Sequence, residues 1–271
     1  MATKIGHQAR QLFSKMHDRA ASTRAGHLDR AEAIGNFMQK QGLRSIEHMK
    51  LKHVQRYMET LKQAGLNAST LSNHASTIRA IADKIGKGDM IAKTNAKAFG
   101  FSRTLEARRQ PVNVNRDLTA RVEQSLNQKG HTWAGLAYKM TKEFGLRRQE
   151  ALLSNKTIER DGKEYLEVKG AKGGKPRQLE VKTPEQREAL RQVREHISRT
   201  GGKSLCPPEK SLEQTKQCYS NHVNRAGGLR AENAHSHANR HAWAQASDKS
   251  DIETAIDLGH GRPEIVKCYK G

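Results

Sequence analysis

The chain has 271 residues, a length that suits one large domain or two modest ones, and we expect two. Its 49 Lys and Arg residues outnumber 28 Asp and Glu residues, so the net charge is +21. Such a surface is drawn to a polyanion, most often nucleic acid; the alternative is a soluble protein with merely solvated lysines. Aromatic residues make up only 4% of the chain, which favours contacts with duplex phosphates over stacking on single-stranded bases.

The cysteine content and the hydropathy of the chain bear on its location. Cys206, Cys218 and Cys268 form no CxxC pair and are too few for a disulfide framework, so a reducing compartment is expected. The first ten residues lack the apolar core of a secretory signal. No stretch approaches the roughly 20 apolar residues that a membrane span needs. These features predict a cytoplasmic, nucleoid-associated protein.

Residues 1–101 read as a small bundle of about four helices. Apolar residues recur at three- and four-residue steps along 28–38, 49–61 and 71–85, which is the period of one helix face. Gly65 stands where a helix end is expected, and Ser69 is expected to cap the helix that follows. The polar faces are rich in Lys, Arg and His, which either touch phosphate or are solvated.

Residues 102–116 are predicted to be an extended basic linker. The stretch contains Arg103, Arg108 and Arg109, and Pro111 disfavours helix at Gln110 before it. Such a linker either follows DNA or serves as a mobile tether.

The second domain, residues 117–271, is predicted to be mixed α/β. Alternating polar and apolar residues indicate short strands at 157–160, 165–168 and 178–181, and Asp161-Gly162 is typical of a hairpin turn. Helices are expected at 117–128, 131–144, 184–198, 211–226, 235–247, 251–258 and 263–269. The predicted fold class is therefore mainly α with a small antiparallel β-sheet.

Five short motifs follow one another in the second domain. They are Gly145-Leu146-Arg147-Arg148-Gln149-Glu150, Lys172-Gly173-Gly174-Lys175-Pro176-Arg177, His237-Ala238-Asn239-Arg240-His241, Leu258-Gly259-His260 and, nine residues after that histidine, Tyr269. In order and spacing they resemble the motifs of the tyrosine recombinases, or phage-type integrases. The family commonly has leucine where this chain has Asn239.

The resemblance implies a helical DNA core-binding domain followed by a tyrosine-recombinase catalytic domain. It implies the catalytic residues Arg147, Lys172, His237, Arg240, His260 and Tyr269. Lys175 and Arg177 are expected to bind DNA. The family cuts and rejoins duplex DNA through a covalent 3′-phosphotyrosine, needs no cofactor, metal or ATP, and acts as a homotetramer on paired sites. Accessory factors that bend DNA or set direction are possible partners.

The residue types suit that chemistry. Attack on a phosphodiester builds negative charge on the non-bridging oxygens, and the planar donors of Arg147 and Arg240 match them. His237 and Arg240 are three residues apart and share a helix face, so His237 is a candidate proton acceptor for Tyr269, while His260 adds a donor to the phosphate. Lys172 is the candidate general acid for the leaving 5′ oxygen, with Lys169 and Lys175 as alternatives.

Simpler interpretations stay open for single residues. Arg147 could pair with Glu150 on a helix surface, and Tyr269 could be a surface tyrosine. His235, His237 and His241 could chelate zinc, although no HExxH motif or cysteine pair supports it. His241 is expected to support the site, and Trp243 to pack in the core.

The sequence thus predicts a site-specific recombinase. One alternative is a type IB topoisomerase, which shares the tyrosine chemistry and would relax plasmid without a paired target site. Another is a non-catalytic DNA-binding protein with the same fold, against which the complete residue set argues.

Overall fold

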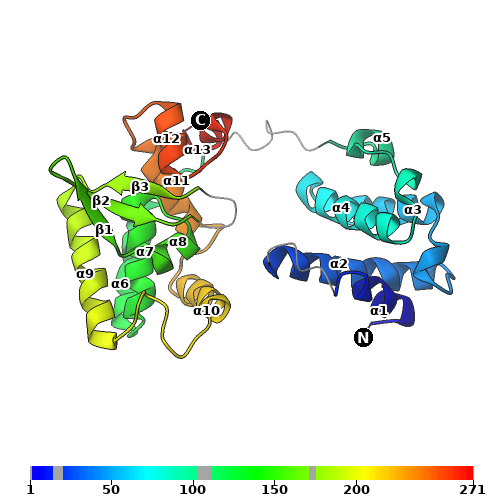
Figure 1. Ribbon diagram of the computed structural model, residues 1–271, viewed down its shortest axis with the longest axis horizontal. Coiled ribbons are helices and arrows are strands. Elements are labelled where there is room, and N and C mark those ends of the chain that lie inside the picture. The colour runs from blue at the N-terminus through cyan, green and yellow to red at the C-terminus, as the bar shows by residue number, and fades with distance from the viewer. Residues whose placement is uncertain (1, 15–20, 103–110, 171–174, 271) are drawn as a thin grey trace. The chain divides into compact units, whose positions relative to one another are not determined.

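The computed structural model describes residues 2–14, 21–102, 111–170 and 175–270. The chain divides into two compact units, Met1–Leu105 and Glu106–Gly271 (Figure 1). Residues 103–110 of the expected linker lie outside the described residues, as do Lys172, Gly173 and Gly174 of the glycine-rich motif.

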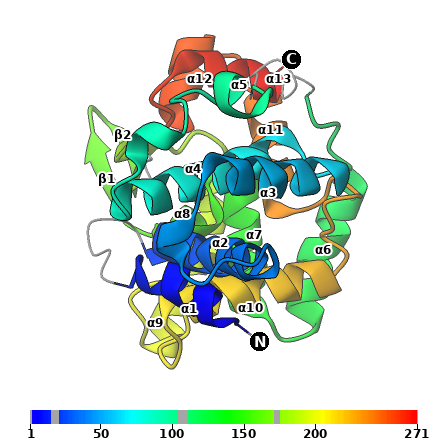
Figure 2. The same ribbon diagram turned by 90° about the vertical axis from the view of Figure 1, so that its right-hand side faces the viewer.

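The first unit is a helical bundle, as its apolar periodicity predicts. Its elements are α1 (Lys4–Gln11), α2 (Ala21–Lys40), η1 (Ile46–His48), α3 (Leu51–Gln63), α4 (Ala68–Lys84), η2 (Gly88–Met90) and α5 (Asn95–Phe99). Figure 2 shows α1 beside α2, and α3 beside α4. Ile34, Met38, Val54, Ile78 and Ile81 are fully buried in one core, because they occupy the inward faces of α2, α3 and α4.

Helix α4 begins earlier than the sequence predicts. Asn67, rather than Ser69, is its N-cap, and the Asn67 side chain accepts a hydrogen bond from the Thr70 backbone N–H at 2.9 Å. Asparagine caps helices at least as well as serine, so the helix starts at the first suitable residue after the preceding turn. The expectation of a Ser69 cap was therefore wrong by two residues.

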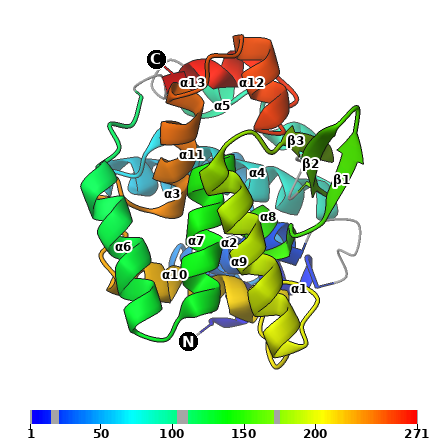
Figure 3. The same cartoon turned by 90° about the vertical axis from the view of Figure 1, so that its left-hand side faces the viewer.

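The second unit combines helices with a small sheet. Its helical elements are α6 (Arg116–Gln128), α7 (Thr132–Phe144), α8 (Arg148–Leu153), α9 (Pro184–Thr200), α10 (Leu212–Arg225), α11 (Ser236–Gln245), α12 (Asp251–Asp257), η4 (Pro263–Val266) and α13 (Lys267–Lys270). Helix α7 packs between α6 and α9 (Figure 3) and carries much of the core. Helix α8 was not predicted, because six residues are too few for a helical period to show.

The sheet is antiparallel, with strands in the order β1 (Thr157–Arg160), β2 (Lys163–Val168) and β3 (Arg177–Glu180). Asp161 and Gly162 both have positive φ, 53° and 70°, as a two-residue type I′ hairpin requires. Leu166 pairs with Leu179, and both side chains are buried against the helices. The predicted fold class is confirmed, and β3 starts one residue earlier than expected, at Arg177.

The search for membrane-spanning segments covered the described residues. Among them, no helix combines the length and the hydropathy that crossing a bilayer would require.

Candidate active site

Arg240 on α11 is the central residue of the site, and it is fully buried. Its Nη1 donates to the Gly145 carbonyl oxygen at 2.5 Å, and its Nη2 donates to the Leu258 carbonyl oxygen. Within the described part of the chain, no carboxylate forms an ion pair with it. Burial lowers the pKa of Arg240 to about 10, so the group is still a cation at neutral pH. A buried cation held by neutral acceptors is suited to receive an anion.

Gly145 places one of those acceptors. It ends α7 at φ +61°, in the left-handed region that favours glycine. A Cβ atom at this position would also lie only 2.7 Å from the Trp243 ring. Both constraints explain why the Gly145–Glu150 motif begins with glycine. Only glycine lets the chain turn there from α7 towards Arg147 while the Gly145 carbonyl oxygen accepts from Arg240.

Tyr269 lies on α13 and is 5% exposed. Its hydroxyl oxygen is 3.5 Å from the Nε of Arg240, which donates to it, and 3.2 Å from the Nε2 of His260. The His241 ring stacks on its ring at 4.4 Å between centroids. The Gln245 side chain donates to its carbonyl oxygen at 3.0 Å, so α11 fixes both the ring and the backbone of the tyrosine.

His260 is a hydrogen-bond acceptor in this arrangement. Its Nε2 lies 3.3 Å from Nη2 of Arg240, and because a guanidinium can only donate, that nitrogen carries the lone pair. Burial, followed by the charges of Arg240 and Arg147, lowers the pKa of His260 to about 3. The imidazole is therefore neutral at working pH, and the Tyr269 hydroxyl lies within hydrogen-bond distance of the same Nε2.

His237 occupies the outer side of the same cluster. Its side chain is exposed, and its ring centroid lies 5.8 Å from that of Tyr269. Loss of hydration next to its neighbours, followed by the charges of His241 and Arg240, lowers the pKa of His237. The structure thus places His260, rather than His237, within hydrogen-bond distance of the phenol. Among the described residues no group of three potential ligands gathers as a metal site.

Arg147 approaches from the start of α8. Its backbone N–H and its Nη1 each donate to Glu150 at 2.9 Å, and its Nη2 donates to the Gly259 carbonyl oxygen at 3.4 Å. Its side chain is 26% exposed, whereas that of Glu150 is 1% exposed. The expected surface pair of Arg147 and Glu150 exists, but its carboxylate is buried inside the site.

A cationic hollow adjoins Arg147 and His237. It encloses about 440 Å³, and its lining includes Arg148, Arg230 and His235. No acidic side chain belongs to its described lining. A hollow of this charge is suited to a polyanion.

Two family models match the chain. The model described as "Integrase" covers residues 111–246, half of the chain, and the "Phage integrase, N-terminal SAM-like domain" covers residues 12–83. The chain belongs to the integrase family. It is a tyrosine recombinase, an enzyme that breaks and rejoins DNA, as its motifs predict. A search of curated proteins found no match.

Solved structures share the fold of this integrase. XerH recombinase in a post-cleavage complex with a palindromic difH substrate is 17% identical, with a TM-score of 0.67 over 98% of this chain and 81% of that one. A lambda integrase tetramer bound to a Holliday junction is 15% identical, with a TM-score of 0.63 over 98% and 76%. The Tn1549 transposon integrase with transposon right end DNA is 14% identical, with a TM-score of 0.58 over 97% of this chain and 94% of that one.

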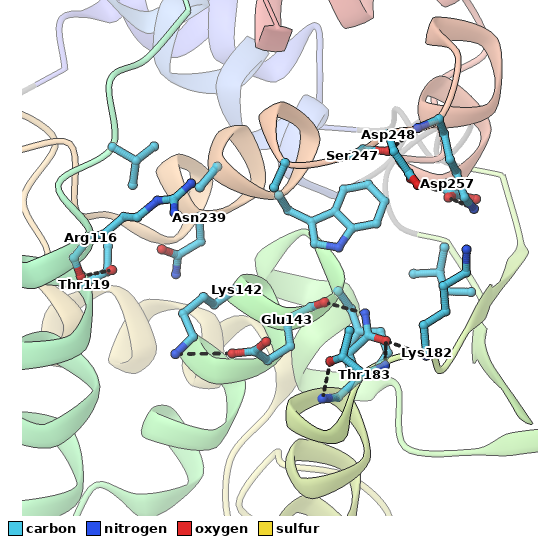
Figure 4. A pocket seen from close by; sticks show the side chains of 18 of the residues that line it. Arg116, Thr119, Lys142, Glu143, Lys182, Thr183, Asn239, Ser247, Asp248 and Asp257 are labelled. Carbon is cyan, nitrogen blue, oxygen red and sulfur yellow. Dashed lines mark hydrogen bonds and ion pairs between the residues drawn. The ribbon is translucent and has the colours of Figure 1, made fainter.

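The two faces of helix α11 contribute to two different places in the integrase. His237, Arg240 and His241 point to the cluster around Tyr269. Asn239, Trp243 and other residues at helical spacing line a separate cavity of about 580 Å³ with Lys142, Glu143 and Lys182 (Figure 4). Asn239 is buried and donates to the Thr141 hydroxyl at 3.0 Å. The amide that replaces the usual leucine therefore faces away from the catalytic cluster.

The predicted site residues have four different outcomes. Arg147, His237, Arg240, His260 and Tyr269 come together in the integrase. Lys175 is exposed and stays a predicted DNA contact, while Lys172 lies outside the described residues.

Arg177 was expected to face DNA, but its side chain is 4% exposed and it pairs with Glu150. Sequence reasoning missed this pair, and it missed the carbonyl groups of Gly145 and Leu258 as holders of Arg240. Backbone acceptors leave no signal in side-chain patterns, and ion pairs across distant motifs leave little.

Proposed function

We propose that Tyr269 is the nucleophile with which this integrase cuts one DNA strand at a time. Its hydroxyl attacks a phosphodiester, the bond from phosphorus to the 5′ oxygen breaks, and a covalent 3′-phosphotyrosine forms with a free 5′ hydroxyl. The reverse attack rejoins DNA, and because the phosphotyrosine conserves the phosphodiester energy, ATP is not required. The observation that carries the proposal is the position of the Tyr269 hydroxyl beside Arg240 and His260.

Arg240 and Arg147 stabilise the phosphate during attack. The scissile phosphate enters at the cluster and supplies the negative charge that the carbonyl partners of Arg240 lack. Each preorganised donor of this kind is worth about 3–4 kcal/mol in the transition state. His237, at the exposed side, donates to a non-bridging oxygen.

His260 accepts the proton of the Tyr269 hydroxyl. This assignment rests on the Nε2 lone pair of His260 and its 3.2 Å separation from the phenol oxygen. The proton for the leaving 5′ oxygen comes from a lysine of the β2–β3 connection, for which Lys172 is the candidate by family resemblance.

The DNA path continues from the scissile phosphate along the cationic hollow of Arg148, Arg230 and His235, where flanking phosphates bind. Lys175, exposed before β3, adds a further phosphate contact. The N-terminal helical unit, which matches the integrase SAM-like domain over residues 12–83, binds the core of the site. Four copies act on two duplexes, as the lambda integrase tetramer suggests, with accessory proteins that bend DNA or set direction.

The test starts by finding a substrate. A pool of random duplexes, each nicked near a central position, is incubated with the integrase, so that the short fragment released by cleavage diffuses away and traps the covalent product. Trapped DNA is recovered from denatured protein and sequenced, and the enriched sequence is remade as a defined nicked duplex, the selected duplex.

Tyr269→Phe is expected to bind the selected duplex as tightly as the wild type and to form no adduct on a denaturing gel. Tyr165→Phe is the matched control, because Tyr165 lies on β2 and its ring packs on Arg160 instead of on residues of the Tyr269 cluster. It should form adduct normally. Adduct formation by Tyr269→Phe at the wild-type level would overturn the nucleophile assignment.

A further inference from the structure

The hydrogen-bond donors of Arg177, at the start of β3, are largely engaged within the protein and are not available to DNA. Its Nη1 and Nη2 donate to the two carboxylate oxygens of Glu150, at 3.1 and 2.9 Å, and its Nε donates to the Asp257 carbonyl oxygen. The paired donors of a guanidinium are the feature that matches a phosphate. In Arg177 those donors already hold a carboxylate, and the side chain is 4% exposed.

Glu150 joins Arg177 to Arg147. Its carboxylate accepts from both guanidinium groups and from the Arg147 backbone N–H, so it also fixes the first turn of α8. Burial alone would raise the pKa of Glu150, but the hydrogen bonds and charge of Arg177, with those of Arg147, lower it to about 2. The carboxylate is therefore ionised at working pH, although its side chain is 1% exposed.

The two arginines also enclose the turn that carries His260. A Cβ atom on Gly259 would lie 2.8 Å from Nη1 of Arg177 and 3.3 Å from Nη1 of Arg147. Arg147 donates to the carbonyl oxygen of Gly259, and Arg177 donates to that of Asp257. Strand β3, the start of α8 and the turn after α12 are thus tied at one buried ion cluster.

We propose that Arg177 is a positioning residue: through Glu150 it keeps the guanidinium of Arg147 oriented for the scissile phosphate, its own charge leaves the three-residue cluster net positive, and it does not bind DNA. The inference rests on the proposed function. Arg147, Glu150 and Arg177 together carry a net charge of +1, from two cations and one anion. Without Arg177, the remaining Arg147–Glu150 pair is neutral, and a phosphate meets no net positive charge there.

The loss of Arg177 also changes geometry. A buried carboxylate deprived of one cation turns to satisfy both oxygens with the other, because an unpaired buried charge is costly. Arg147 would then present its paired donors to Glu150 instead of to phosphate. Both effects reduce the stabilisation of the transition state more than they reduce the affinity for a long duplex, because many other phosphate contacts support duplex binding.

The experiment compares Arg177→Met, Glu150→Gln and the double variant on the selected duplex. Single-turnover cleavage at saturating enzyme and the Kd from fluorescence anisotropy are measured. Arg177→Met is expected to slow cleavage roughly tenfold or more while the Kd changes less than about twofold. In the double variant the carboxylate charge that Arg177 offsets is gone, so its rate should return to within about threefold of Glu150→Gln alone.

The control variant is Arg191→Met. Arg191 on α9 makes a similar paired contact with Glu188, at 2.7 Å to each oxygen, but it is exposed and lies outside the site. It should cleave as the wild type does. A Kd for Arg177→Met that rises as much as the cleavage rate falls would show that Arg177 anchors DNA. If the cleavage rate of the double variant falls by the product of the two single fold-reductions, Arg177 and Glu150 act independently and the inference is wrong.

A second measurement covers the case in which Arg177→Met does not fold. Arg177→Lys keeps the charge and loses the paired donors, and it is tested on a selected duplex with a neutral methylphosphonate at the scissile position. Because that group has one negative charge fewer to stabilise than a phosphodiester, the defects of Arg147→Lys and Arg177→Lys should shrink by similar factors. An unchanged Arg177→Lys defect would overturn the inference. Absence of adduct with the wild type would instead count against the proposed function itself.

Discussion

The two arginines of the site are held in opposite ways. Arg240 is fully buried, and neutral acceptors, two carbonyl oxygens among them, hold it without a carboxylate. Arg147 is partly exposed and shares the buried carboxylate of Glu150 with Arg177. Arg240 therefore stores a positive charge that only a substrate phosphate can balance. The charge that Arg147 offers depends on a third residue, so the two sides of the site should fail differently when they are altered.

Replacing each arginine by lysine is the strongest way to test this comparison. Arg240→Lys is expected to slow cleavage of the selected duplex by about 10³, because one ammonium group cannot reach Gly145, Leu258 and the Tyr269 hydroxyl together. Arg147→Lys is expected to cost about 10². Single-turnover cleavage rates of the two variants, with the Kd of each for the same duplex, measure both losses. A larger loss for Arg147→Lys would contradict the contrast.

Neutralising Glu150 should destabilise the protein in a pH-dependent way. Its pKa is lowered to about 2, so its ionised form adds stability that is present above the ordinary pKa near 4.5 and is lost as pH falls towards 2. The shift corresponds to roughly 3 kcal/mol. Urea unfolding of Glu150→Gln and wild type at pH 7 and at pH 3 should show a gap that narrows in acid. A gap of equal size at both pH values would count against the ion cluster.

His260 should have a somewhat smaller effect on the pH dependence of stability, because it is buried as a neutral group whereas Glu150 is buried as an ion. With a folded-state pKa of about 3, it takes up no proton between pH 7 and 5, whereas an unfolded histidine does so near 6.5. Stability therefore falls as pH drops below about 6.5, and His260→Gln should remove up to about 2 kcal/mol of that loss at pH 5. Imidazole NMR shifts recorded without DNA provide the direct check. A His260 midpoint near 6.5 would contradict the lowered pKa that burial and the neighbouring arginines give it.

Asn239→Leu should have the smallest effect. The side chain faces the cavity of Figure 4 on the far side of α11 from Tyr269, and the family commonly has leucine there. The change removes one hydrogen bond to Thr141 and adds apolar burial, so stability should change by less than about 1 kcal/mol. Cleavage should equal that of the wild type. A large cleavage loss would mean that the two faces of α11 are not separate in function.

The sequence predicted those parts of the integrase that depend on local spacing. His237, Arg240 and His241 share one face of α11 because helical geometry demands it, and the Asp161-Gly162 turn was predictable because these residue types tolerate the positive φ that the structure shows at both. The meeting of Arg147, His260 and Tyr269 came from the family resemblance, since no local rule joins segments more than a hundred residues apart.

Other features depend on the folded chain and escaped prediction. The burial of Arg177 follows from β3 starting at that residue and from a carboxylate 27 positions earlier, which no periodicity shows. His260 looked like a donor to phosphate until its contact with Arg240 fixed the lone pair on Nε2. Asn67 is the cap instead of Ser69 because two suitable capping residues lie two positions apart and local sequence does not choose between them.

Direct identification of the amino acid that carries the DNA is the most decisive measurement. The adduct trapped on the selected duplex is digested with nuclease and with a protease that cuts after glutamate, which releases residues 265–271, a peptide whose single tyrosine is Tyr269. Mass spectrometry is expected to find the nucleotide on that peptide, linked through the tyrosine oxygen. A nucleotide attached to any other peptide would contradict the account of the site built around Arg240, His260 and Tyr269.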